Sequence, residues 1–164
     1  MIVVDASVAV AGLLNNGSAR QYLAAQQVPA PHLIDSEVAS GLRRHVLSQN
    51  LTADQGWAAL DTWRRLGLTR YPVHQLMERI WSLRDILSAY DAGYVALAEL
   101  LDCPLLTADA RLSNGPGLRC PVTVMPRESG PGTDHSLDWN DNIKRRAATH
   151  GPPHESSGSA WSSL

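Results

Sequence analysis

The 164-residue chain contains no phenylalanine, only two cysteines, and no apolar run long enough to cross a bilayer. Without phenylalanine, the core has to be built from leucine, valine, isoleucine and alanine, with a few tryptophans and tyrosines. Cys103 and Cys120 match no metal-binding or redox spacing, so we expect no disulfide framework and a reducing, cytoplasmic setting. The N-terminus opens directly on a predicted strand, so we expect neither a signal peptide nor a membrane partner.

Lysine is absent from residues 1–127, where 11 arginines balance 11 aspartates and glutamates. The formal net charge of −2 for the whole chain argues against nucleic acid as a partner. However, acids gathered around a metal ion would be neutralised, and the remaining surface would then be positive. Arginine pairs with phosphate as a planar fork, which suits an RNA substrate. A GC-rich genome explains the arginine excess equally well, so the composition does not decide between the two.

Predicted strands alternate with predicted helices over the first three quarters of the chain. Residues 1–10 are expected to form a strand at 2–4 that enters a helix, and residues 28–33, with two prolines, to reach the sheet only at their end. Further strands are expected at 68–71, 104–107 and 122–125, and further helices at 19–26, 36–48, 52–67, 73–87 and 91–101. Asp35 or Ser36 is the expected cap of the second of these helices, and Thr52 and Gln55 form a capping box for the third. The alternation predicts an α/β fold: a parallel central sheet with helices on both faces, in a Rossmann-like three-layer arrangement.

Glycine, proline, serine, histidine and asparagine dominate the end of the chain. This segment has no sustained hydrophobic period, and its apolar surface is too small to offset the entropy lost on ordering. We therefore predict a folded domain over residues 1–126 and a low-complexity, disordered tail over residues 127–164.

Four acidic residues each lie where a predicted strand meets a predicted helix: Asp5, Glu37, Asp91 and Asp109. In an open α/β sheet, ligands bind beyond the carboxyl ends of the strands. Carboxylates gathered there would repel one another unless a cation held them together. Their hard oxygen atoms suit Mg²⁺ or Mn²⁺, so the sequence predicts a metal-dependent site for a phosphate-bearing substrate.

Each acid taken alone has a purely structural alternative. Asp5 and Asp109 are placed to cap the helices or turns that follow them. Glu37 lies in a first helical turn, where the helix dipole favours negative charge. Ser88 and Asp91 fit a helix-capping pattern. The shared site is therefore predicted from the four acids together, because four independent helix caps need not all fall where a strand leads into a helix.

Four segments together resemble the PIN-domain ribonucleases, and their order and spacing are most similar to the VapC-type toxins of bacterial toxin–antitoxin pairs. The matching segments are Ile2–Ser7, Pro31–Val38, Tyr90–Glu99 and Leu105–Leu112. The resemblance covers residues 1 to about 126 and includes all four acids. It implies a PIN-like fold and an endoribonuclease that depends on Mg²⁺ or Mn²⁺.

The resemblance also implies roles for individual residues and partners. Asp5, Asp91 and Asp109 would hold the metal, and Glu37 would complete the site or orient the attacking water. Ser7 and Thr107 would be polar neighbours of these acids. Family members are usually homodimers, and a small antitoxin of the VapB type inhibits them.

Two further pairs of residues have open interpretations. Arg43 and Arg44 follow Glu37 along its helix and either contact the RNA backbone or form a solvated helix face. Trp57 and Trp63 either stack on bases or pack in the core or a dimer interface.

Three other functions compete with the toxin. A PIN-like module that only binds a partner would not need four acids. A PIN nuclease outside any toxin–antitoxin pair would share the same residues. A receiver-like phosphoacceptor needs paired acids near the first strand and a late lysine, whereas Asp5 has no acidic neighbour and residues 1–127 contain no lysine.

Overall fold

The computed structural model of the protein describes residues 1–15, 17–25 and 28–125. The tail predicted from residue 127 lies outside the described residues, so its character and the domain boundary at residue 126 stay predictions. None of the helices in the described part of the chain is both long and apolar enough to cross a membrane.

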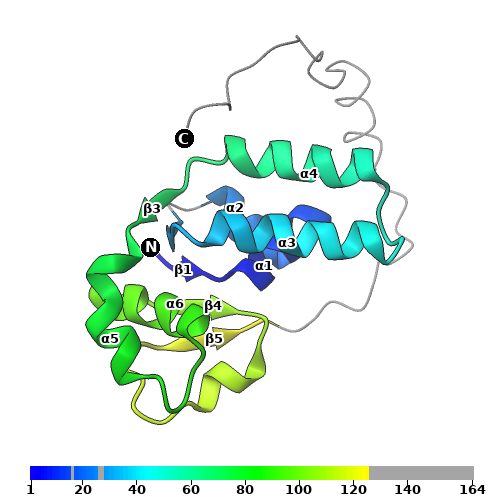
Figure 1. Cartoon of the computed structure of the whole chain (residues 1–164). Coiled ribbons are helices and arrows are strands. Elements are labelled where there is room, and N and C mark those ends of the chain that lie inside the picture. The colour runs from blue at the N-terminus through cyan, green and yellow to red at the C-terminus, as the bar shows by residue number, and fades with distance from the viewer. Residues whose placement is uncertain (16, 26–27, 126–164) are drawn as a thin grey trace, which may run out of the picture.

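Strands and helices alternate along the chain as the sequence predicts (Figure 1). In order they are β1 (Val3–Val4), α1 (Ala6–Leu14), α2 (Ser18–Ala25), β2 (Pro29–Pro31), α3 (Ile34–Leu47), α4 (Ala53–Arg65), β3 (Thr69–Tyr71), the 3-10 helix η1 (Val73–Leu76), α5 (Met77–Ser82), α6 (Ala89–Leu100), β4 (Leu105–Thr107), the 3-10 helix η2 (Ala110–Asn114) and β5 (Val122–Val124). All strand pairings are parallel, which confirms the predicted fold class.

The strands form two hydrogen-bonded groups. One has the order β1-β4-β5, with Val3 opposite Leu105, and the other pairs β2 with β3. β2 lies against β1 without a ladder between them in the described structure. Val28 and His32 form backbone hydrogen bonds to β3 on either side of Ala30. Because the backbone groups of a strand alternate in direction, those of Pro29 and Pro31 point toward β1. Proline has no N–H to donate, which explains the interruption of the sheet.

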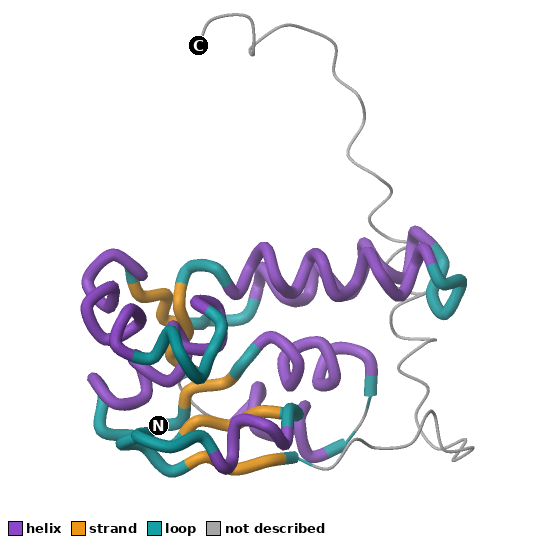
Figure 2. Tube along the Cα trace, turned by 60° about the horizontal axis from the view of Figure 1, so that its bottom comes forward, coloured by secondary structure: helices purple, strands orange, loops and turns teal. Residues whose placement is uncertain are grey.

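Helices flank the sheet in two groups, which Figures 1 and 2 show from different sides. Helix α1 packs against α2 and α3, α3 packs against α4, and α5 packs with α6, which contacts β1, β2 and β4. The core side chains of β1 and β4 are fully buried. Residues 92 to 98 of α6 are also buried, and most of them are small, which lets this helix lie close to the strands.

Asp35 and Ser36 do not cap α3, contrary to the sequence prediction. The helix begins after Leu33, and no side chain of the described residues caps it. Asp35 instead accepts two hydrogen bonds from the Arg70 guanidinium (2.6 and 2.8 Å) and one from the Trp63 indole (2.8 Å). A bidentate charged pair and a buried indole N–H satisfy this carboxylate better than a backbone cap would. The predicted capping box of Thr52 and Gln55 is confirmed at α4.

The helix predicted over residues 73–87 is shorter than expected. It consists of η1, then α5, then turns up to Leu87. Leu76 and Leu83 adopt ψ values near 0°, which end the first two pieces. Three apolar side chains at helical spacing in this segment, Leu76, Ile80 and Leu83, are nevertheless buried, because 3-10 turns also bring residues three positions apart to one side.

A substitution at Gly12 tests the close packing of α1 on α2. A Cβ at Gly12 would lie 2.6 Å from Leu23 Cδ1 and 3.1 Å from the backbone of Ala19, whereas a Cβ at Gly93 in α6 would meet only Ile80, at 4.0 Å. Alanine favours a helix over glycine by about 1 kcal/mol, and overpacking costs about 1–3 kcal/mol. We expect Gly12→Ala to lower the free energy of unfolding in urea and Gly93→Ala to raise it. Equal effects of the two substitutions would contradict the close α1–α2 contact.

Candidate active site

Asp5 lies at the carboxyl end of β1, beside the carboxyl end of β4. Its side chain is buried, and its Oδ1 atom accepts hydrogen bonds from the Ser7 hydroxyl (2.6 Å) and the Val8 N–H (3.0 Å). Its Oδ2 atom accepts a hydrogen bond from the Thr107 hydroxyl (2.5 Å). The bond from Val8 is an N-cap of α1, so the structural role considered for Asp5 is present.

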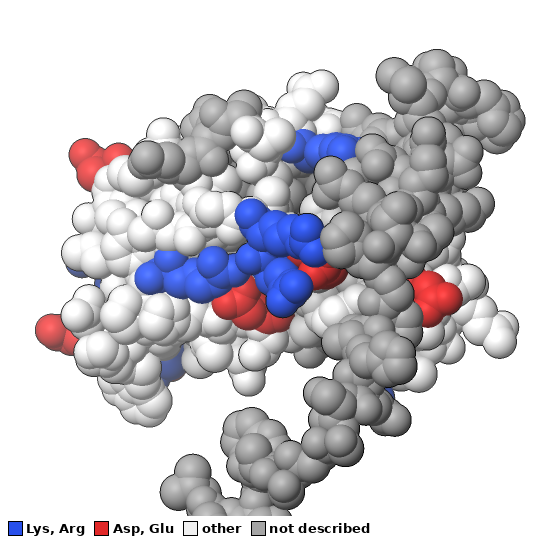
Figure 3. Space-filling view, turned by 90° about the horizontal axis from the view of Figure 1, so that it is seen from above, with Lys and Arg blue, Asp and Glu red and all other residues white. Residues whose placement is uncertain are grey.

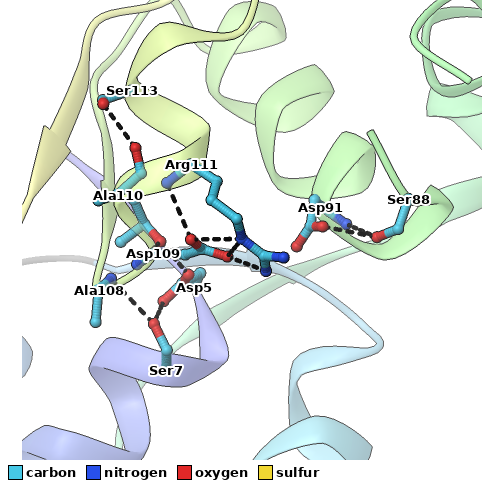
Figure 4. Close-up of polar contacts among 10 residues, drawn as sticks. Asp5, Ser7, Ser88, Asp91, Ala108, Asp109, Ala110, Arg111 and Ser113 are labelled. Atoms are coloured by element: carbon cyan, nitrogen blue, oxygen red, sulfur yellow. Dashed lines mark hydrogen bonds and ion pairs between the residues drawn. The ribbon is translucent and has the colours of Figure 1, made fainter. Parts of the chain in front are cut away.

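Two hydroxyl groups join the end of β1 to the loop after β4. Ser7 Oγ accepts the Ala108 N–H (3.0 Å), and Thr107 Oγ1 accepts the Asp109 N–H (2.9 Å). Figure 4 shows Ser7 between Asp5 and Ala108. Because each hydroxyl already accepts an N–H, its own proton is directed to Asp5. Both groups therefore fix the orientation of the Asp5 carboxylate.

Burial raises the pKa of Asp5 above its ordinary value, and the hydrogen bonds from Ser7, Thr107 and Val8 oppose this rise. The protein therefore stabilises the charge of Asp5 only in part.

Glu37 projects from the first turn of α3 and is half-buried. Its Oε2 atom accepts a hydrogen bond from the Tyr94 hydroxyl of α6 (2.5 Å). Burial raises the pKa of Glu37, the Tyr94 hydrogen bond opposes the rise, and the charges of Asp5 and Asp91 add to it. Burial and the neighbouring Glu37 also raise the pKa of Tyr94, which keeps the phenol protonated as a donor.

Asp91 lies in the first turn of α6, where Ser88 is the N-cap. The Ser88 hydroxyl accepts the Asp91 N–H (3.2 Å) and donates to Asp91 Oδ2 (2.8 Å), as the capping pattern in the sequence predicts. The charge of Asp91 nevertheless adds to the raised pKa of Glu37, so the two carboxylates lie within electrostatic reach of each other.

Asp109 follows β4 and caps η2 by accepting the Arg111 N–H (3.0 Å). The Arg111 guanidinium folds back over the same carboxylate, with Nε 3.0 Å from both oxygens and Nη2 2.5 Å from Oδ2. In Figure 4 this guanidinium lies between Asp109 and Asp91, and both acids raise the pKa of Arg111.

Glu37 thus lies within electrostatic reach of both Asp5 and Asp91, and Asp109 lies on the junction beside Asp5. Their oxygen atoms meet the chemical requirement for a hard cation. Their positions do not yet form a coordination shell. Among residues 1–15, 17–25 and 28–125, no three side chains of His, Cys, Asp or Glu are grouped closely enough to hold a metal ion.

The remaining predicted site residues lie outside this acidic region or on its margin. Arg43 and Arg44 are exposed on α3, as both interpretations of this pair allow. Trp57 is exposed on α4, whereas Trp63 is only 1% exposed and belongs to the core, so Trp63 is not available to stack on a base.

Basic side chains gather on the face that carries α4, directly beside acidic ones (Figure 3). Arg64 and Arg65 of α4 pair with Asp61, each at 2.6 Å, and Arg70 pairs with Asp35. Much of the positive charge contributed by these arginines is therefore balanced by neighbouring acids.

Sequence reasoning missed two residues of the site, Tyr94 and Arg111. Tyr94 is the one hydroxyl-bearing side chain within the buried run of residues 92–98, which is a signal that it needs a polar partner. Arg111 follows Asp109 by two positions at a predicted turn, where a side chain can fold back onto the preceding carboxylate.

The model of the PIN domain family matches residues 2–118. The chain belongs to the PIN-domain family. Ribonuclease VapC9 of Mycobacterium tuberculosis is 61% identical over 127 residues, which cover 77% of this chain and 100% of that protein. Ribonuclease VapC1 of the same organism is 44% identical over 128 residues, covering 75% of this chain and 96% of the relative. Within the PIN-domain family, the chain is a member of the VapC group.

Two solved structures share the fold of this PIN-domain protein. A toxin–antitoxin complex from Klebsiella pneumoniae has a TM-score of 0.54 at 22% identity and covers 76% of this chain and 97% of its own. The VapBC2 complex from Rickettsia felis, bound to a promoter DNA fragment, has a TM-score of 0.57 at 14% identity and covers 76% and 98%.

The raised pKa values of Asp5 and Glu37 predict how the stability of the metal-free protein depends on pH. Their ordinary values are 3.8 and 4.5, and the folded state binds protons more tightly than the unfolded state does. The free energy of unfolding should therefore fall as pH rises from about 4 through the raised values, and then level off.

The measurement is a series of thermal melts in chelator across this pH range. In Asp5→Asn the fall should be smaller, because the variant lacks both the Asp5 titration and the effect of its charge on Glu37. Asp54→Asn, which removes an exposed acid of α4, is the control and should keep the wild-type slope. An equal slope in Asp5→Asn would contradict the raised pKa of Asp5.

Proposed function

We propose that this PIN-domain protein is an endoribonuclease and the toxin of a type II toxin–antitoxin pair. The proposal rests on the arrangement of the acids taken together with the similarity to a known ribonuclease. Glu37 lies within electrostatic reach of Asp5 and Asp91, Asp109 follows the Thr107 that bonds to Asp5, and the chain is 61% identical to a VapC ribonuclease along the whole length of that relative. A structural role for each acid alone would not require Asp5, Glu37 and Asp91 to approach one another against their mutual repulsion.

Asp5, Glu37, Asp91 and Asp109 are the residues that would hold Mg²⁺ or Mn²⁺ at this site. A divalent cation held there would neutralise the phosphodiester and lower the pKa of a bound water, which would make a nucleophile available at neutral pH. The donor set suits such a cation because all of its ligand atoms are carboxylate oxygens.

Residues of the protein chain supply orientation and proton transfer. The Ser7 and Thr107 hydroxyls hold the Asp5 carboxylate in one orientation, and Tyr94 holds one oxygen of Glu37. Glu37 orients the attacking water and accepts its proton, because a carboxylate with a raised pKa is a better base than an exposed one. Arg43 and Arg44 contact the RNA backbone on the exposed face of α3.

A small antitoxin of the VapB type is the proposed protein partner, and a homodimer is the proposed assembly. The Klebsiella and Rickettsia structures of this fold are complexes of toxin with antitoxin. This chain also exposes large apolar side chains, among them Met77, Trp81, Tyr90 and Leu100 of α5 and α6. Exposed apolar surface of this kind is typical of protein–protein interfaces.

A catalytically silent binding module is the second candidate function. The observation that favours it is that Asp109 is paired with Arg111 and that the described acids form no ready metal cluster. The two candidates differ in whether RNA is cleaved and whether divalent cations bind.

Removal of single acids tests the nuclease. Asp5→Asn and Glu37→Gln should each reduce Mn²⁺-dependent cleavage of structured RNA at least about a hundredfold, because each change removes a ligand or the base. Asp54→Asn in α4 should cleave as the wild type does. Both site variants should melt no lower than the wild type, since each removes a charge that is only partly stabilised. Undiminished cleavage by Asp5→Asn would exclude the proposed site.

Cation binding gives a test that does not depend on finding the RNA substrate. Mn²⁺ at a hundredfold excess over its dissociation constant should stabilise the fold by about 2.7 kcal/mol. The gain should shrink as pH falls, because protons compete with the metal for the carboxylates. A melting temperature that does not respond to millimolar Mn²⁺ at neutral pH would favour the silent module.

A further inference from the structure

The protein chain supplies a positive charge to its own acidic site, the guanidinium of Arg111. Its side chain is 88% exposed, yet its guanidinium contacts both oxygens of Asp109, whose own side chain is 27% exposed. Asp91 of α6 also raises the pKa of Arg111, so the guanidinium interacts with two of the four acids. The charge of these two acids favours a positively charged group at this position.

The local backbone explains why Arg111 reaches this position. Asp109 caps η2 by accepting the Arg111 N–H, which fixes the start of the arginine side chain beside the carboxylate. The guanidinium then folds back over the same carboxylate from the solvent side. Asp109 is joined to Asp5 through Thr107, so the guanidinium lies next to the Asp5 junction as well as facing α6.

We infer that Arg111 exchanges one anion for another: it neutralises Asp109 in the metal-free protein, and it binds a phosphate of the RNA when that carboxylate holds a divalent cation. The inference rests on the proposed nuclease function and adds a phosphate-binding residue to it. Arginine suits both partners, because its planar fork matches carboxylate and phosphate oxygens equally well.

Charge balance supports this exchange. Four carboxylates repel a phosphodiester, and in the metal-free protein Arg111 offsets part of their charge. A divalent cation that binds to Asp109 takes over this neutralisation and releases the guanidinium. The Asp109–Arg111 pair is solvent-exposed, and exposed ion pairs are weak enough to be replaced. The released guanidinium remains on the exposed side of Asp109, where it can meet an RNA phosphate.

The inference predicts that one substitution has opposite effects on two ligands. Arg111→Ala should bind Mn²⁺ more tightly than the wild type, by roughly fivefold, because a competing cation is gone. The same variant should bind RNA at least roughly tenfold more weakly at saturating cation, because a charged, bidentate phosphate contact is lost. A residue with a merely structural role would not change the two affinities in opposite directions.

The experiment uses the full chain. Isothermal titration calorimetry with Mn²⁺ gives the first affinity. Fluorescence anisotropy of a labelled RNA hairpin at saturating Ca²⁺, a hard cation that carboxylates also bind, gives the second. Arg111→Lys keeps the charge without the fork, so its Mn²⁺ affinity should stay near that of the wild type while its RNA affinity is intermediate.

Arg64→Ala is the matched control. Arg64 pairs with an aspartate three residues away, Asp61, at 2.6 Å, but it lies on α4. This variant should keep both wild-type affinities. Unchanged or weaker Mn²⁺ binding by Arg111→Ala, or unchanged RNA binding, would overturn the inference for Arg111 alone. If neither the wild type nor Arg111→Ala binds Mn²⁺, the proposed metal site fails and the inference fails with it.

Discussion

A buried carboxylate at the end of β1 is the constraint on which the site depends. Asp5 can lie there only because donors from two chain segments satisfy it, and Thr107 reaches it only through the parallel pairing of β1 with β4. Both strands are short, so this pairing is held mainly by fully buried side chains such as Val3, Val4 and Leu105. The packing of the core therefore also determines the geometry of the site at this junction.

The acids serve the fold and the site at once. Asp5 caps α1, Asp109 caps η2, and Glu37 and Asp91 lie in first turns where the helix dipole favours a negative charge. These interactions compensate part of the repulsion that gathering the acids creates. The structural alternatives considered from the sequence are thus correct locally, and they do not compete with a common site. They explain how the chain tolerates acids so close together.

The sequence predicts the fold well where the signal is local. Buried strands, the capping box at Thr52 and the small-residue face of α6 all follow from propensity and periodicity. Prediction from the sequence fails where the partner of a side chain is distant along the chain. Asp35 pairs with Arg70, 35 residues away, instead of capping α3, and Glu37 accepts a hydrogen bond from Tyr94, 57 residues away. No pattern within a helix signals such pairs, because they exist only once α3, α6 and β3 are packed.

The number of free lone pairs limits what each acid can still bind. An ionised carboxylate has about four acceptor positions, and Asp5 uses at least three of them for Ser7, Val8 and Thr107. Asp5 can therefore offer a cation little more than one further contact. Glu37 has more positions left beside its bond to Tyr94, whereas Asp109 accepts both the N–H and the guanidinium of Arg111. Among the proposed ligands, Asp5 is therefore the one that the fold holds in a single orientation, and Glu37 keeps more acceptor positions for a cation.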